Sequence, residues 1–394
     1  MVFPITCGKI DKNIIYIIVP IVITIFEYSY AIKAYEKIYH FHKIIFKICQ
    51  ALAMTLSFIP FIILKINNKS SNNNNNNLYD KEYLDKYKNV KYKKYGLIIL
   101  SSFLTFLFKI IHYALNLYES GDISYWFFAV IFISIFSYFI LKNSLYRHQY
   151  LGIIIFLISG IILNMINYWK DEIKSLNIIG SLVEHIINSF NMVLKKYIVE
   201  YTFCYVSELI FYEGIITLVL FIITLIICTN IELSNDIKDC EHVIYNGKCY
   251  FDNFNKYYES LDTSQVFIFL FIMLYYTPYF YCFFNTMKSY TVFHLFIIYI
   301  FEEDIFYEMF DGKEREVWLI VVNIILFIIL FFMILVFTEM VELNFCKLSE
   351  NIKRNISNRP DKDEEDLDIP RESLIELEGN YYVNQDNINE SSIL

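Results

Sequence analysis

Long apolar runs dominate this sequence and limit what it can fold into. A helix that crosses a membrane needs about 20 mostly apolar residues to cover about 30 Å of hydrocarbon. Runs close to that length recur ten times in the 394 residues, 56% of which are hydrophobic. The predicted spans are 13–33, 44–64, 96–116, 123–141, 150–169, 177–197, 205–227, 265–287, 291–307 and 317–340.

These runs are too long for the alternating strands of a membrane barrel, which have about 10 residues each. The sequence therefore predicts an all-α, polytopic integral membrane protein with ten transmembrane helices. The first run is also longer than the apolar part of a signal peptide, and its flank "YAIKAYEKIYH" lacks a clear small-residue cleavage site. We expect the first helix to be retained.

Lysine and arginine close to the span ends predict the orientation, because cytosolic loops are enriched in these residues. With both termini cytosolic, the dense basic segments fall on one side: the loop after span two, "KNSLYRH" after span four, Lys195 and Lys196, and "KLSENIKRN" after span ten. The basic turn "KNSLYRH" would then lie in the cytosol and fix the orientation of the hairpin that spans four and five form. The loops after spans one and nine also carry basic residues and disagree with this orientation.

Composition divides the chain into further regions. An asparagine run flanked by serines has little apolar surface to bury, so we expect disorder there. The expected regions are a short cytosolic N-terminus (1–12), a first group of five spans (13–169) with a disordered cytosolic loop (65–94), a second group (177–340) with a luminal loop (229–264), and an acidic cytosolic tail (341–394).

Two of the eight cysteines differ from the rest, which lie in or beside predicted spans. Cys240 and Cys249 bracket "EHVIYNGK", whose Asn246-Gly247 pair favours a tight turn. A disulfide across this turn is expected if the loop faces an oxidising compartment, and two unpaired thiols are the alternative. A metal site is not indicated, because no paired CxxC spacing accompanies them.

Polar side chains inside the spans are the candidate substrate-cavity residues, because a charge in hydrocarbon costs a few kcal/mol or more. The candidates are Glu27, Lys109, His112, His185, Glu208, Asn285 and Glu302. Lys109 and His112 are three residues apart and share a helix face, as a polar cavity wall requires. An alternative is that Lys109 pairs with Glu27 as a purely structural contact.

The other candidates also have structural alternatives. Glu184 and His185 are adjacent, so their side chains diverge by about 100° around a helix. At most one of them readily faces any single neighbouring helix. His185 is either a proton relay or a hydrogen-bonded structural histidine. Glu302, with two further carboxylates after it, forms either an acidic vestibule or the aqueous end of a span that stops near Ile300.

The sequence lacks the motifs of the common catalytic centres. It contains no P-loop, no dinucleotide-binding glycine fingerprint, no HExxH and no GxSxG. We therefore expect no catalytic residues, no cofactor, no bound metal and no nucleic-acid partner. The expected partners are the lipid bilayer and a small-molecule substrate, and a homodimer is left open.

Four stretches resemble one family of membrane proteins. They are "FILKNSLYRHQYLGIIIFLISGIIL", "VLKKYIVEYTFCYVSELIFYEGI" with its Glu213-Gly214 pair, "YYTPYFYCFFN" and "FTEMVELNFCKLSENIKRNI". In this order they resemble the drug/metabolite transporter superfamily, specifically the EamA-like, nucleotide-sugar-transporter-like proteins of solute carrier family 35. The resemblance implies two inverted five-helix repeats, 13–169 and 177–340, around a central cavity, with the substrate bound near the midplane.

The leading hypothesis is a secondary transporter that moves a small polar organic solute, such as a metabolite, a nucleotide sugar or a drug-like compound, across an internal membrane by alternating access. The expected location is the Golgi, the endoplasmic reticulum or a vacuole-like or lysosome-like compartment, with the plasma membrane open. Spans four and nine lack the small residues that the family keeps there. A non-transporting scaffold or degenerate family member is therefore the alternative.

Overall fold

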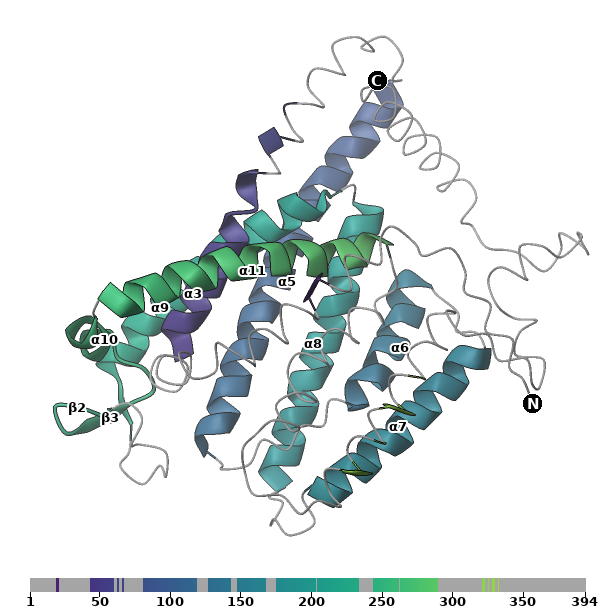
Figure 1. The fold of residues 1–394 in the computed structure, drawn as a ribbon. Helices are drawn as coiled ribbons and strands as arrows, with labels where there is room; N and C mark the ends of the chain where they lie inside the picture. The colour runs from purple at the N-terminus through teal and green to yellow at the C-terminus, as the bar shows by residue number, and fades with distance from the viewer. Residues whose placement is uncertain are drawn as a thin grey trace, which may run out of the picture. The chain divides into compact units, whose positions relative to one another are not determined.

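The structure is a computed structural model of the whole chain. It describes residues 19–20, 43–59, 62–63, 66, 81–118, 127–142, 147–167, 175–202, 204–233, 244–261, 263–289, 321–322, 325, 328–329 and 332. All of them belong to one compact unit, Met1–Leu343 (Figure 1).

The described part of the chain is mostly helical. With the labels of Figure 1, its helices are α3 (Lys43–Thr55), α5 (Lys81–Tyr118), α6 (Phe127–Leu141), α7 (Arg147–Asn167), α8 (Ser175–Tyr201), α9 (Val206–Asn230), α10 (Phe254–Ser260) and α11 (Thr263–Ser289). Three short strands, β1 (Glu232–Leu233), β2 (Ile244–Tyr245) and β3 (Lys248–Tyr250), follow α9.

The predicted all-α class is confirmed at the level of secondary structure, because each predicted span within the described residues coincides with a helix or overlaps one. Two helical segments are long and apolar enough to cross a membrane, Tyr92–His112 within α5 and the whole of α9. The apolar parts of α3, α6 and α7 are shorter. The predicted span 291–307 lies outside the described residues, and 13–33 and 317–340 lie almost entirely outside them.

The loop predicted over 65–94 is corrected at its C-terminal part. α5 begins at Lys81, so residues 81–94 are helical. Their lysines and tyrosines looked like a solvated linker, but lysine, glutamate and leucine are good helix formers, and the apolar run that follows continues the same helix. The asparagine run itself, 72–77, lies outside the described residues.

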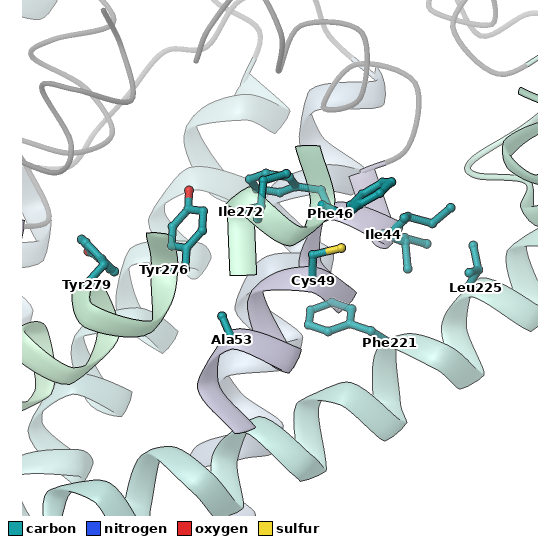
Figure 2. Close-up of a cluster of buried hydrophobic side chains, with 11 residues drawn as sticks. Ile44, Phe46, Cys49, Ala53, Phe221, Leu225, Ile272, Tyr276 and Tyr279 are labelled. Atoms are coloured by element: carbon teal, nitrogen blue, oxygen red, sulfur yellow. The ribbon is translucent and has the colours of Figure 1, made fainter. Parts of the chain in front are cut away.

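Helices of the first predicted group pack on helices of the second. α3 lies against α9 and α11, α5 lies against α8 and α9, and α6 lies against α7 and α8. Figure 2 shows α3 in a cluster of buried apolar side chains, where Phe46 and Cys49 lie near Phe221 of α9 and Ile272 of α11. A second cluster joins α5, α8, α9 and α11 around Ile98, Ile198, Leu209 and Phe284.

α9 carries large apolar residues on its exposed face and buries polar residues among apolar ones on the other. Its exposed large side chains are Ile215, Val219, Ile222, Ile223, Ile226 and Ile227, which recur at helical spacing. Glu213 and Thr217 are buried on another face. A water-soluble protein buries its apolar side chains and exposes its polar ones, so this distribution is typical of a helix whose outer face meets lipid.

The segment after α9 contains a small antiparallel sheet in the order β1-β3-β2. β2 and β3 form a hairpin in which Ile244 pairs with Cys249 and Tyr245 with Lys248. The two residues between them have φ of 51° and 75°, as a type I′ turn requires. The tight turn predicted at Asn246-Gly247 is therefore confirmed.

This segment also contacts the start of α3. Asp252 accepts a hydrogen bond from the Ile44 backbone N–H through Oδ2, at 2.9 Å. Asn253 caps α10 by accepting from the backbone N–H groups of Asn255 and Lys256. Because the first N–H groups of a helix have no partner within it, Asp252 satisfies a donor that α3 leaves open.

Candidate functional site

One row of residues on α5 faces α8 and α9. Its positions follow at intervals of four and three residues, which keeps them on one side of a helix. Its members are Lys94, Ile98, Ser101, Thr105, Phe108 and His112. The two apolar members are buried, and the four polar members bond to side chains of α8 or α9.

Glu213 of α9 lies in a polar network that joins three helices. Its Oε1 accepts from Nζ of Lys195 (α8) at 2.6 Å and from Oγ1 of Thr105 (α5) at 2.7 Å. Asn191 of α8 donates to Thr105 at 2.8 Å and accepts from Ser101 at 2.8 Å. The side chains of Glu213 and Lys195 are only 1% and 10% exposed, so these bonds form away from bulk water, where they are electrostatically stronger.

The second carboxylate oxygen of Glu213 is different. Oε2 is buried and accepts no hydrogen bond from the described residues. On the other side of the pair, Nζ of Lys195 lies 4.9 Å from the centroid of the Phe284 ring of α11. A buried carboxylate oxygen without a donor is costly, so Oε2 has the capacity to bind one further donor.

The depth of Glu213 is set by its neighbour Gly214. A Cβ atom at Gly214 would lie 2.8 Å from the backbone N of Thr55 and 2.9 Å from Cβ of Met54, both in α3. These distances are closer than real carbon contacts allow, so only glycine permits this approach of α9 to α3. Glu213 is thereby held in the interior, one residue from the close approach of α9 to α3.

A second buried ion pair joins α5 and α9. Nζ of Lys94 donates to both carboxylate oxygens of Glu208, at 2.8 Å and 3.0 Å. The two side chains are 7% and 6% exposed, and Sγ of Cys204 lies 3.8 Å from Oε2 of Glu208. Unlike Glu213, this glutamate has both oxygens bound by its cation.

A third polar contact lies at the other end of the α5 row. Nδ1 of His112 is 2.9 Å from Oε1 of Glu184 in α8, and the histidine is 30% exposed. Lys94 and His112 are 18 residues apart, which corresponds to about 27 Å along a helix. The polar contacts of α5 are thus spread over nearly the thickness of the hydrocarbon core, about 30 Å.

The predicted cavity residues have different environments. Lys109 is half-buried, and its Nζ lies 4.7 Å from the centroid of the Phe108 ring. His112 makes the polar contact with Glu184, and Glu208 makes the ion pair with Lys94, both described above. Asn285 donates to the Tyr281 carbonyl of its own helix at 2.7 Å. The structure therefore brings Glu208 and His112 to the α5 row and leaves Asn285 bonded within α11.

Glu27 and Glu302 lie outside the described residues. The pairing of Lys109 with Glu27 therefore stays a prediction. His185 and its neighbour Glu184 are both buried although they diverge around the helix. This is possible because α8 packs against both α5 and α6.

The candidate residues did not include the centre of the network. From the sequence, Lys195 is expected to mark the cytosolic side and Lys94 to lie in a disordered loop. Glu213 lies in a predicted span as half of the Glu213-Gly214 pair. A usable signal was present, because Glu184, Asn188, Asn191 and Lys195 repeat the four-three spacing of the α5 row on α8.

The β2–β3 hairpin contains Cys249, which is buried and disulfide-bonded. Cys240 lies outside the described residues, so the pairing of Cys240 with Cys249 stays a prediction. Within the described ranges, no group of three or more histidine, cysteine, aspartate or glutamate side chains could hold a metal ion.

No protein-family model matches this sequence, and a comparison with curated proteins finds no match. The function is therefore inferred from the chemistry of the polar network.

Proposed function

We propose that this chain is a secondary transporter that moves a small polar organic solute across an internal membrane by alternating access. The observation that carries the proposal is the Lys195–Glu213 pair, buried in a helix bundle with two membrane-length apolar segments in its described part. Ionisable groups inside a membrane bundle are costly, and they commonly mark substrate or ion pathways.

The arrangement of the polar contacts supports alternating access. The proposal includes ten transmembrane helices as two inverted five-helix repeats, 13–169 and 177–340. Lys94, Thr105 and His112 of the first repeat contact Glu208, Glu213 and Glu184 of the second. A rocking motion of one repeat against the other would break and remake these contacts.

The solute is expected to be polar, because the network offers hydroxyl, amide and charged groups. Metabolites, nucleotide sugars and drug-like compounds are the classes proposed from the family resemblance, with no enzymatic activity and no cofactor. Both termini are proposed to be cytosolic, in an endomembrane such as the Golgi, the endoplasmic reticulum or a vacuole-like or lysosome-like compartment.

A polytopic scaffold without transport is the second candidate. It is favoured by the mutual satisfaction of Lys94 and Glu208 and by the close approach at Gly214. Polar pairs and small residues also hold membrane helices together when they have no ligand.

Uptake by the purified full-length protein in proteoliposomes tests the proposal. With a panel of metabolites, nucleotide sugars and organic cations, we expect saturable uptake of at least one compound. Glu213→Gln should reduce this uptake. The matched control is Glu200→Gln, because the Lys196–Glu200 pair lies within one helix and its glutamate is partly exposed.

Absence of flux for every compound, in a preparation shown to be folded, would contradict transport and favour the scaffold. Lys109→Met and Glu27→Gln test the predicted cavity wall separately. Unchanged uptake kinetics in both variants would exclude these two residues from the pathway.

A further inference from the structure

The three buried glutamates of the polar contacts differ in how their oxygens are used. Glu208 has both oxygens bound by Lys94, and Oε1 of Glu184 lies against His112. In Glu213, Oε1 accepts two hydrogen bonds while Oε2 accepts none from the described residues. Glu213 is thus a buried carboxylate with a vacant acceptor next to a cation that already partly neutralises it.

We propose that Glu213 is a proton-binding site, at which a proton and the Lys195 ammonium group alternate as the cation that neutralises the carboxylate. This inference rests on the proposed transport function and names the ion to which it is coupled. In the state described here Lys195 occupies Oε1, and Oε2 is the atom that accepts the proton when the helices separate.

The burial of Oε2 favours a proton as its ligand. Oε2 is shielded from solvent, so in this state no organic solute reaches it. A hard metal cation needs several oxygen ligands, and within the described residues no group of three or more histidine, cysteine, aspartate or glutamate side chains could hold one. A proton needs one lone pair and almost no volume, which is what Oε2 offers.

The surroundings of Glu213 leave Lys195 as the cation that bonds to it. α8 brings Lys195, and α5 brings the neutral Thr105. Of the α5 lysines, Lys94 is bound by Glu208, and Nζ of Lys109 lies 4.7 Å from the centroid of the Phe108 ring. α3 brings Met54 and Thr55 to the adjacent Gly214. α11 brings the Phe284 ring beneath Lys195.

Among the described elements α10 also packs against α9, and it meets α9 at the far end. The Phe254 N–H donates to Oγ1 of Thr229, which is 16 residues beyond Glu213, or about 24 Å along the helix. Lys256 and Glu259 of α10 are therefore distant from the carboxylate.

The proton balance of the step is simple. When the Lys195–Glu213 pair separates toward one side of the membrane, a proton from water adds to Oε2 and the carboxylate becomes a neutral carboxylic acid. Lys195 keeps its own proton throughout. When the helices close again, the proton leaves to water on the opposite side and Lys195 returns to the carboxylate.

Infrared difference spectroscopy tests this inference without a substrate. The full-length protein in lipid nanodiscs is titrated from about pH 9 to about pH 5, a range that includes the values reached by buried carboxyl groups. The C=O stretch of a carboxylic acid reports protonation. We expect a buried-carboxyl band that is absent from Glu213→Gln and unchanged in Glu200→Gln.

Lys195→Met provides a second, independent readout. Removal of the cation leaves a buried carboxylate uncompensated, and such a group neutralises by binding a proton. The Glu213 band should therefore be present at neutral pH in Lys195→Met, where it is weak or absent in the unchanged protein. This variant also decides the question if Glu213→Gln fails to fold.

Persistence of the band in Glu213→Gln, or an unchanged spectrum in Lys195→Met, would overturn the inference. These outcomes are distinguishable from a failure of the proposed function. Proton binding without solute uptake would discredit transport alone, whereas uptake without a titrating Glu213 would leave a carrier that is not coupled through this site.

Discussion

The Glu213 carboxylate connects two helices through a single oxygen atom. Its Oε1 lies 2.6 Å from Lys195 and 2.7 Å from Thr105, and both contacts are buried. Sequence periodicity indicates which face of α8 or α9 such residues occupy. It does not indicate which helix lies opposite, because a neighbour is chosen by packing over the whole bundle. The sequence therefore identifies Glu213 as a polar residue of a predicted span, but it does not identify Lys195 and Thr105 as its partners.

Breaking this pair should be strongly destabilising. Lys195→Met and Glu213→Gln should each lower the free energy of unfolding by about 3–5 kcal/mol, because each leaves a buried polar partner uncompensated. The double variant should lose less than the sum, by about 0.5–3 kcal/mol, as coupled neighbours do. Equilibrium unfolding in detergent micelles measures all three. Strictly additive losses would show that the two side chains do not interact.

Two lysines of the segment 229–264 have pKa shifts of opposite direction. The hydrogen bond from Lys248 to Glu232, together with the charge of Glu232, raises the pKa of Lys248 above its ordinary value of 10.5. Burial lowers the pKa of Lys256 below 10.5, against the opposing attraction of Asp252. The stabilisation from Lys248 is thus fully present below pH 10.5 and is lost above it. The burial penalty of Lys256 is fully present below its lowered pKa and falls as pH rises from that pKa to 10.5.

Competitive acylation at mildly alkaline pH measures these directions, because only the uncharged amine reacts. Lys256 should react faster than an ordinary exposed lysine, and Lys248 more slowly. Glu232→Gln should accelerate the reaction at Lys248 and leave Lys256 unchanged. Faster labelling of Lys248 than of Lys256 in the unchanged protein would contradict both assignments.

At the scale of elements, the sequence predicts helices well where long apolar runs end in polar segments. The run at 150–169 corresponds to α7 (Arg147–Asn167), and the run at 177–197 to α8 (Ser175–Tyr201). Prediction from apolar runs fails at the start of α5, because its first turns are basic and polar although the helix is continuous from Lys81. A run of apolar residues indicates a helical segment that lipid or protein covers. A helical segment without such cover has no apolar run by which the sequence would predict it.

Helix proximity at Gly214 gives a prediction for α3 and α9. Gly214→Ala would place Cβ against backbone and Cβ atoms of α3, so it should destabilise the protein by about 1–3 kcal/mol, as overpacking does. Gly96→Ala in α5 is the matched control, since no atom lies within 4 Å of its new Cβ. That variant should be neutral or more stable by up to about 1 kcal/mol, because alanine favours helix. Equal effects in the unfolding assay would refute the close approach.

At the scale of the whole molecule, the described part of the chain buries charged groups together with its apolar clusters and also exposes many large apolar side chains. Charged residues such as Lys94, Glu208 and Glu213 are buried, while isoleucines of α9 and phenylalanines of α11 are exposed. The ten-span arrangement was expected from apolar runs and from the family resemblance. Of the described helical segments, two meet the length and apolarity needed to cross a membrane.

Membrane integration follows as a prediction for the full-length chain. After alkaline carbonate extraction of membranes from expressing cells, the protein should remain in the pellet and dissolve only with detergent, because its exposed apolar helices would otherwise meet water. A known peripheral protein of the same membranes serves as the control. Release of the chain into the carbonate supernatant would contradict an integral location.

α5 is much longer than a bilayer requires. Its 38 residues extend over about 57 Å, whereas the hydrocarbon core is about 30 Å thick. If Tyr92–His112 crosses the lipid, residues 81–91 extend the same helix beyond it by about 17 Å. About half of α5 would then lie outside the hydrocarbon.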